Sequence, residues 1–435
     1  MKVAIIGAGA AGLAAAWDLC AQGHDVTVYE AGREVGGLAA GFKDEGWDWT
    51  LEKFYHHWFQ TDSDILKLLD ELGKSDQVMF PRPKTSYWID GKIYRSEISL
   101  SALKLPLSLV GKLRLGLSGV FLKLTHDWKS LEKITAERWM LRYMGREVYE
   151  RLWRPLLIGK FSDRFASVNM AWMWARIKAR SLRLGIYQGG FQAFMNDLAA
   201  AVKARGAVIH LATPVEHISQ SGDDQVALTI RGERVIYDRV LSTLSPSLML
   251  KLTHGLADTD YGHMTGSLES IGALCVVFAL KQSLLTDGTY WLNLPATSPD
   301  KTRSRFPFLA LVEHTNWMDK RHYNDDVIVY CGDYVPPDHE YFTLPDDELA
   351  ARFAAVLPQF NPAFKPEWVR KSWVFRAPYA QPVPEVNHSQ KIPPIQTPIN
   401  GLFWASMSHV YPWDRGTNFA VEIGRRTARM MMGQD

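Results

Sequence analysis

Residues 1–30 read MKVAIIGAGAAGLAAAWDLCAQGHDVTVYE, and this stretch decides the fold. Residues 3–6 form a short apolar run typical of a buried strand, residues 13–20 have an alanine-rich helical pattern, and residues 26–29 predict a second strand. The glycines of the first turn lie between the first strand and the helix. A strand, a glycine-rich turn, a helix and a second strand in this order indicate a βαβ unit of the Rossmann type.

The spacing of these glycines suits a bound dinucleotide. Gly7 permits a tight turn, Gly9 lets the backbone approach a pyrophosphate, and Gly12 lets the helix pack closely on the sheet. The helix N-terminus offers unpaired N–H groups to the phosphates. Glu30, at the end of the second strand, can accept hydrogen bonds from ribose hydroxyls. The alternative, a chance glycine-rich turn in another α/β fold, explains less of this pattern.

A second glycine pair follows Glu30 in the segment AGREVGG at residues 31–37. Gly36 and Gly37 allow another close approach of the backbone, and Arg33 can add a positive charge near the pyrophosphate. With both motifs, the chain resembles the flavin-containing amine oxidase superfamily, in particular its protoporphyrinogen oxidase and phytoene desaturase-like branch. The resemblance implies a bound FAD.

The same resemblance extends to the middle and the end of the chain. It implies that the backbone of Val215 meets the adenine, and that a final helix over residues 421–432 has its N-terminus facing the flavin, with Asn418 close to it. The acid that the family often has after its last strand is replaced by Ser-Met-Ser at residues 406–408.

The expected fold is therefore α/β, with a discontinuous Rossmann-type FAD-binding domain (GR2-like) and an α+β substrate domain. The FAD-binding domain is expected to comprise residues 1–80, 187–255 and 396–435. The substrate-binding domain is expected to comprise residues 81–186 and 256–395, with a helical insertion at about 98–183.

Composition excludes several other classes. The chain has 435 residues, with 49 Lys and Arg against 47 Asp and Glu, so it carries no global basic signature for nucleic acid. Its three cysteines are far apart, which predicts no metal site and favours a reducing, cytoplasmic location. No signal peptide is expected before the first strand, and no apolar run is long enough to span a membrane.

Residues 98–126 are leucine-rich and contain four Lys and Arg but no acid. One interpretation is peripheral contact with an anionic membrane on its inner face. The other is a helical pair packed inside the substrate domain, with its lysines reaching out to solvent.

The strongest candidate for catalysis is residues 55–61, YHHWFQT. This segment resembles a flavin-proximal histidine segment of UDP-galactopyranose mutase, which implies that His57 lies beside the flavin, with His56 next to it. Alternatively, both are hydrogen-bonded structural residues. Arg415 and Tyr411, just before the last helix, are candidates for contact with substrate or flavin.

These observations predict an FAD-dependent oxidoreductase that transfers hydride from a small lipophilic or amine substrate to flavin, which oxygen or another acceptor then reoxidises. The alternative is a UDP-galactopyranose mutase-like flavoenzyme acting on a sugar nucleotide. A flavin-binding protein without activity is a third hypothesis. The sequence leaves the oligomeric state open.

Overall fold

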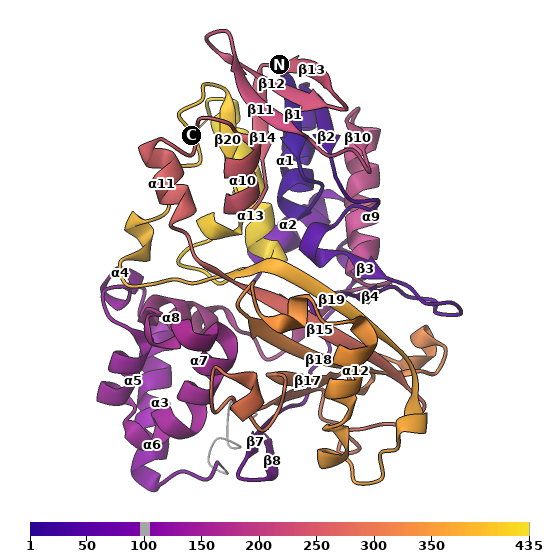
Figure 1. Cartoon of the computed structure of the whole chain (residues 1–435), viewed down its shortest axis with the longest axis vertical. Coiled ribbons are helices and arrows are strands. Elements are labelled where there is room, and N and C mark those ends of the chain that lie inside the picture. Colours follow the sequence, from indigo (N-terminus) through magenta and orange to yellow (C-terminus); the bar gives the residue numbers. More distant parts are fainter. Residues whose placement is uncertain (96–104, 435) are drawn as a thin grey trace.

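The computed structural model describes residues 1–95 and 105–434, and its two largest sheets lie one above the other in Figure 1. The upper sheet is parallel, with strand order β10-β2-β1-β14-β20. Its strands are β1 (Lys2–Ile6), β2 (Asp25–Tyr29), β10 (Val208–His210), β14 (Arg239–Ser242) and β20 (Leu402–Trp404). Strands from the start, the middle and the end of the chain meet in one sheet, which confirms the expected discontinuous Rossmann-type α/β fold.

Both faces of the parallel sheet are covered, which explains the continuous apolar run in β1. Val3 and Ile5 belong to the core that includes α1 (Ala10–Ala21), α9 (Phe191–Ala204) and α13 (Thr417–Met431). Ala4 and Ile6 belong to a separate core on the other side. Helix α2 (Ser63–Glu71) packs against α13.

The second face of the sheet is covered by a three-stranded antiparallel sheet. It consists of β11 (His217–Ser221), β12 (Gln225–Ile230) and β13 (Glu233–Tyr237). Of the four consecutive strands β11 to β14, only β14 joins the parallel sheet.

The lower sheet has seven strands in the order β19-β15-β18-β17-β16-β7-β8 and is mainly antiparallel. The long central pair, β15 and β18, is buried along almost its whole length. The strands are β7 (Thr85–Ile89), β8 (Lys92–Arg95), β15 (Ser270–Leu280), β16 (Trp291–Asn293), β17 (Ala310–Glu313), β18 (Val327–Val335) and β19 (Val369–Pro382).

A group of helices flanks the lower sheet, at the lower left of Figure 1. A π-helical turn at Tyr149–Trp153 runs directly into α7, where it displaces the following residues from regular α-helical register. The helices are α3 (Leu109–Leu124), α4 (Trp128–Leu131), α5 (Ala136–Tyr143), α6 (Arg146–Val148), α7 (Arg154–Phe161) and α8 (Met170–Ala179).

Shorter elements connect the two halves. The small sheets contain β3 (Gly41–Phe42) with β4 (Leu51–Glu52), and β9 (Leu184–Tyr187) between β5 (Trp58–Phe59) and β6 (Val78–Met79). The remaining α-helices are α10 (Pro246–Leu252), α11 (Asp260–Gly266) and α12 (Asp346–Ala354). The residue numbers at which we divide the chain into two domains stay a prediction.

Helix α13 begins at Thr417, four residues before the start that the sequence predicts. This earlier start places Thr417 and Asn418 in the first helical turn. The first turn therefore lies immediately after Arg415, which lines the cavities described below.

Candidate functional site

The turn between β1 and α1 is closely packed around its glycines. A Cβ at Gly12 would lie 2.0 Å from the carbonyl oxygen of Gly7, so only glycine allows this approach of helix to strand. By contrast, a Cβ at Gly9 would meet only the carbonyl oxygen of Gly36, at 3.9 Å. Helix α1 has no side-chain cap and no acid in its first turn, which leaves its N–H groups available to an anion.

Glu30 holds the glycine-rich loops together. One of its carboxylate oxygens accepts a hydrogen bond from the Ala8 N–H at 2.8 Å, and the other accepts one from the Gly32 N–H at 2.7 Å. A carboxylate has about four acceptor sites, so it retains capacity for ribose hydroxyls. The loop, the helix N-terminus and Glu30 therefore fit the adenosine diphosphate half of FAD.

The other expected FAD contacts surround this turn. Gly36 bridges to Gly9, and its N–H donates to the Ala8 carbonyl at 2.9 Å. Arg33 and Gly37 are exposed, whereas Val215 is buried. Just before Val215, Thr213 donates its N–H to the carbonyl of Glu30. The structure thus brings these residues to one region, and their contacts with FAD stay predictions.

The two histidines are both held inside the protein but differ in their partners. His56 Nδ1 is hydrogen-bonded to the Phe54 carbonyl, and His57 Nε2 is hydrogen-bonded to the Tyr290 hydroxyl. Burial lowers the pKa of His56 to about 4, with a further contribution from Arg415. Burial also lowers the pKa of His57 to about 3. Both rings are therefore neutral at neutral pH.

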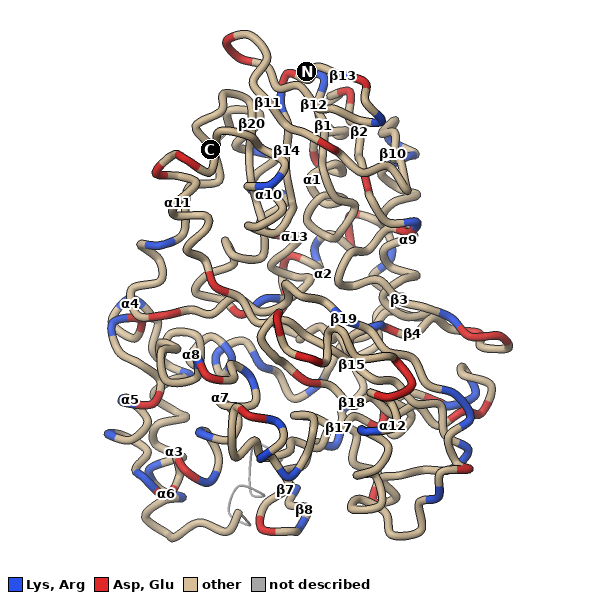
Figure 2. Tube along the Cα trace, in the orientation of Figure 1, with Lys and Arg blue, Asp and Glu red and all other residues tan. Residues whose placement is uncertain are grey.

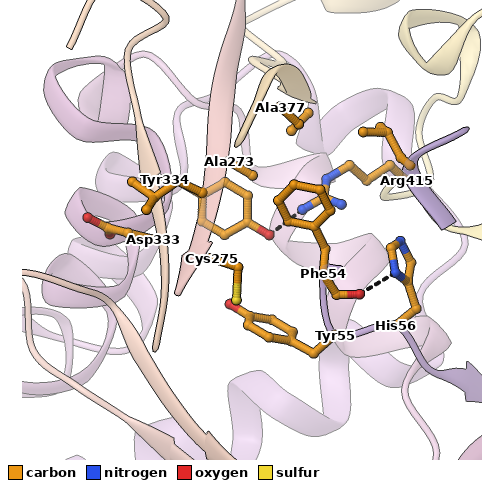
Figure 3. A pocket seen from close by; sticks show the side chains of 12 residues that line it. Phe54, Tyr55, His56, Ala273, Cys275, Asp333, Tyr334, Ala377 and Arg415 are labelled. Atoms are coloured by element: carbon orange, nitrogen blue, oxygen red, sulfur yellow. Dashed lines mark hydrogen bonds between the residues drawn. The ribbon is translucent and has the colours of Figure 1, made fainter. Parts of the chain in front are cut away.

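Both histidines face a cavity of about 210 Å³ that lies between the two halves of the molecule. Its wall combines segment 55–62 and the start of α13 with α7, α8 and the lower sheet. A smaller cavity of about 40 Å³ shares Tyr55, His56, Tyr334 and Arg415 with it. Figure 3 shows that Arg415 and Tyr334 meet beside this smaller cavity.

Positive charges dominate the wall of the larger cavity. Lys160, Arg176, Arg180 and Arg415 line it, against the carboxylates of Asp62 and Asp414. The Arg176 guanidinium donates to Asp414 at 2.5 Å. Burial would raise the pKa of Asp414, but Arg176, Lys160 and Arg415 outweigh it and hold this pKa well below its usual range.

Lys160 is the most enclosed of these cations. Its side chain is buried, and its Nζ lies 3.6 Å from the centroid of the Tyr334 ring. Burial lowers its pKa well below the usual range, and Arg415 lowers it further. One feature of the sequence could have marked this residue. Lys160 is the single lysine in the apolar run of residues 155–161, and lysine is rarely buried without a partner.

Asn418 and Tyr411 have partners within the protein. Asn418 lines the larger cavity, but its Oδ1 accepts the N–H groups of Asp64 and Ile65, both at 3.0 Å, and so caps α2. Tyr411 is absent from the lining of both cavities and donates its hydroxyl to Glu132 at 3.0 Å. Roles for Asn418 and Tyr411 in FAD or substrate contact stay predictions.

Lys160, Asn293 and Tyr334 are among the lining residues that sequence motifs did not predict. Each comes from a different element, and the neighbouring residues of Asn293 and Tyr334 do not mark them as part of a site. Within the described residues, no group of three or more His, Cys, Asp or Glu could hold a metal ion.

Comparisons with known proteins agree with this geometry. Protoporphyrinogen oxidase 2 of Arabidopsis thaliana is 29% identical over 180 residues, which cover 39% of this chain and 34% of that protein. The chain spans no more than about a third of the length of the first curated relatives that it matches.

Solved structures share the fold over the whole chain. Reduced UDP-galactopyranose mutase has a TM-score of 0.77 at 16% identity and covers 100% of this chain and 96% of that one. Cyclohexylamine oxidase from Brevibacterium oxydans has a TM-score of 0.68 at 14% identity and covers 100% of this chain and 99% of that one.

The family model described as flavin containing amine oxidoreductase matches residues 10–432, almost the entire chain. This match confirms the expected flavin cofactor, and the glycine-rich turn with Glu30 fits the adenosine diphosphate half of FAD. The chain therefore belongs to the flavin-containing amine oxidoreductase family.

Proposed function

We propose that this protein is an FAD-dependent oxidoreductase that oxidises a small-molecule substrate in the 210 Å³ cavity. The observation that carries the proposal is the position of this cavity, enclosed by the segment of His56 and His57, the start of α13 and the lower sheet. When bound, FAD accepts the electrons of the substrate as a hydride. The protein contributes orientation and the exclusion of water.

The walls of the cavity favour a lipophilic substrate over a simple amine. Leu156, Trp291 and Leu309 supply an apolar surface on the side of the lower sheet and α7. An ammonium group would be repelled by the nearby guanidinium groups. We infer that the apolar part of the substrate packs against Trp291.

His57→Ala tests the proposed site. We expect the wild-type protein to show a flavin absorption spectrum and to release FAD in acid. In the variant, we expect a shifted flavin spectrum and turnover lowered about 100-fold, because the neutral ring contributes a hydrogen-bonding group to the cavity. Because burial holds its pKa near 3, removing His57 should delete no ionisation from the pH–rate profile between pH 5 and 9.

The control is His263→Ala, which changes an exposed histidine on α11. It should leave spectrum and turnover unchanged. A colourless wild-type protein that cannot be reconstituted with FAD would contradict the proposed function. A His57→Ala variant with the wild-type spectrum and turnover would contradict only the role of His57.

A sugar-nucleotide mutase-like activity is the second candidate. Arg176 and Arg180 lie one helical turn apart at the end of α8, and both line the cavity, where they are available to a diphosphate. Protection of the FAD-loaded protein by UDP against thermal unfolding would favour this candidate. Bleaching of the flavin by a lipophilic substrate would favour the oxidoreductase.

We further propose that α3 docks on an anionic bilayer. One side of this helix packs inward through Gly111, Ser118 and Leu122. Its other side exposes large apolar side chains whose spacing follows the helical repeat: Leu109 (84% exposed), Val110, Leu113 (63%), Leu117 (64%), Val120, Phe121 and Leu124 (71%). Such a contiguous exposed apolar surface is unusual on a soluble monomer.

The charge of this helix supports an anionic lipid surface as its partner. Helix α3 carries Lys112, Arg114 and Lys123 and no acid, and Arg114 lies against the backbone of Arg142. Figure 2 shows both basic and acidic residues on the neighbouring helices α5 and α6, which include the acids Glu137 and Glu147. Positive charge beside exposed leucines is complementary to an anionic lipid surface. Residues 98–104 of the predicted membrane segment lie outside the residues that the structure describes. Among the described residues, no helix has the length and the apolar character needed to span a bilayer.

The double variant L113E/L117E tests this docking. We expect the wild-type protein to sediment with vesicles of phosphatidylcholine and phosphatidylserine at 4:1, and the double variant to bind at least tenfold more weakly, because two carboxylates would enter the apolar surface. Leu248→Glu, at an exposed leucine on α10, is the matched control. Equal binding of the double variant, or a wild-type dimer that the two substitutions dissociate, would overturn the membrane proposal.

A further inference from the structure

The larger cavity contains more positive charge than the protein itself neutralises. Asp414 is engaged by Arg176 and by the Trp172 indole N–H at 3.0 Å. The other carboxylate, Asp62, accepts the Phe59 N–H at 2.8 Å at the start of α2. Two carboxylates therefore face four cationic side chains.

Three of these cations lack an anionic partner. Among the residues that the structure describes, Arg176 pairs with Asp414, but none of Lys160, Arg180 and Arg415 has a carboxylate within ion-pair distance. Arg415 instead donates to Gln381 and to the Tyr334 hydroxyl. The neighbour of Lys160 is the face of the Tyr334 ring, a weaker site for a cation than a carboxylate. Arg180 ends α8 and faces the cavity. Arg180 is exposed, whereas Lys160 is buried. Burying the Lys160 cation without a counterion is unfavourable, which indicates that a ligand supplies the missing negative charge.

The geometry of α8 suits a single anionic group. Arg176 lies in the last turn of α8, and Arg180 directly follows this helix. Both line one cavity, and Lys160 lines it from α7. A guanidinium group can donate two parallel hydrogen bonds to a carboxylate or a phosphate, whereas an ammonium group binds as a point charge. The same cavity has apolar walls at Leu156 and Leu309.

We propose that Arg180, Arg176 and Lys160 form a subsite for an anionic group, carboxylate or phosphate, at one end of the substrate. This inference rests on the proposed function, since the anionic group belongs to the molecule that is oxidised. The apolar part of the substrate then lies along Trp291 and Leu309. The subsite thus defines the substrate class as an amphipathic anion.

The test compares three probes with the same eight-carbon chain: octanoate, octyl phosphate and octylamine. Each is titrated into the FAD-loaded protein while the visible flavin spectrum and the temperature of thermal unfolding are recorded. We expect octanoate or octyl phosphate to perturb the spectrum and raise the unfolding temperature, and octylamine to do neither. The tighter of the two anions identifies the head group as carboxylate or phosphate.

Arg180→Gln is expected to weaken binding of the preferred anion at least tenfold, and Lys160→Met is expected to weaken it as well. Arg234→Gln, at an exposed arginine on β13, is the matched control and should bind like the wild type. Octylamine binding as tightly as the anions, or unchanged anion binding in Arg180→Gln, would overturn the subsite. If either result is obtained with a protein that shows the flavin spectrum, the subsite is wrong but the proposed function still stands. A wild-type protein without flavin would contradict the proposed function itself.

Discussion

Gly12→Ala is expected to abolish FAD binding and to lower the free energy of unfolding by about 3 kcal/mol. The added Cβ would lie 2.0 Å from the carbonyl oxygen of Gly7 and 3.2 Å from the Cγ2 of Ile5. The first contact is with backbone, so no side chain can rotate away to relieve it. Helix α1 must move away from β1, and its N-terminus then leaves the position that suits the phosphates. Flavin absorbance after reconstitution and urea unfolding measure the two effects.

Two other glycines separate the causes of this loss. Gly116→Ala on α3 meets no atom within 4 Å and should leave FAD binding unchanged, with a small gain in stability. Gly9→Ala has room in the protein, because its nearest neighbour is 3.9 Å away. We expect it to fold normally and to bind FAD more weakly, since the methyl group would occupy space that the dinucleotide approaches. Full FAD binding by Gly12→Ala would contradict the role of this turn.

The sequence predicts the dinucleotide half well because the interactions that define it are local. Gly7, Gly12 and Glu30 lie within one βαβ unit, where each spacing corresponds to one contact. The sequence also predicts that the middle and the end of the chain return to this half, and β10, β14 and β20 join the sheet that β1 and β2 begin. The order of the strands is seen only in the structure.

The larger cavity could not be predicted in the same way. Its wall combines residues that are far apart in the chain, such as Lys160, Asn293 and Tyr334, and no periodic pattern links them. Asn418 shows a related difficulty. The sequence predicts the last helix but starts it at residue 421, after Asn418, and it does not reveal that the Asn418 amide caps α2. Contacts between residues that are far apart in the chain determine both the lining of the cavity and the partners of Asn418.

Helix α3 shows what composition can and cannot decide. A basic, leucine-rich helix is compatible with burial in the substrate domain and with exposure. The structure buries Leu122 and exposes Leu109, Leu117 and Leu124, so most of the apolar face has no partner among the described residues. Exposure of this face follows from how α3 packs on α8, which the sequence does not show.

Asp414→Asn is the second substitution with a large expected effect, a loss of about 3–5 kcal/mol in the free energy of unfolding at pH 7. The carboxylate accepts hydrogen bonds from Arg176 at 2.5 Å and from the Trp172 indole at 3.0 Å. Lys160 and Arg415 also stabilise its charge, and their influence keeps its pKa far below the usual range. The amide would leave these enclosed cations without a negative charge. Urea unfolding of the FAD-loaded protein measures the loss.

The pH dependence of this loss identifies its electrostatic origin. A carboxyl group with a lowered pKa in the folded state stabilises the protein fully above its unfolded pKa, about 3.9, and ceases to do so as pH falls through the folded value. The difference between wild type and Asp414→Asn should thus be constant from pH 5 to 8 and narrow below about pH 4. Asp325→Asn, which removes an exposed pair with Lys320, should cost no more than about 1 kcal/mol. A difference between wild type and Asp414→Asn that persists unchanged in acid would instead indicate that the amide is badly accommodated, and would contradict the counterion role.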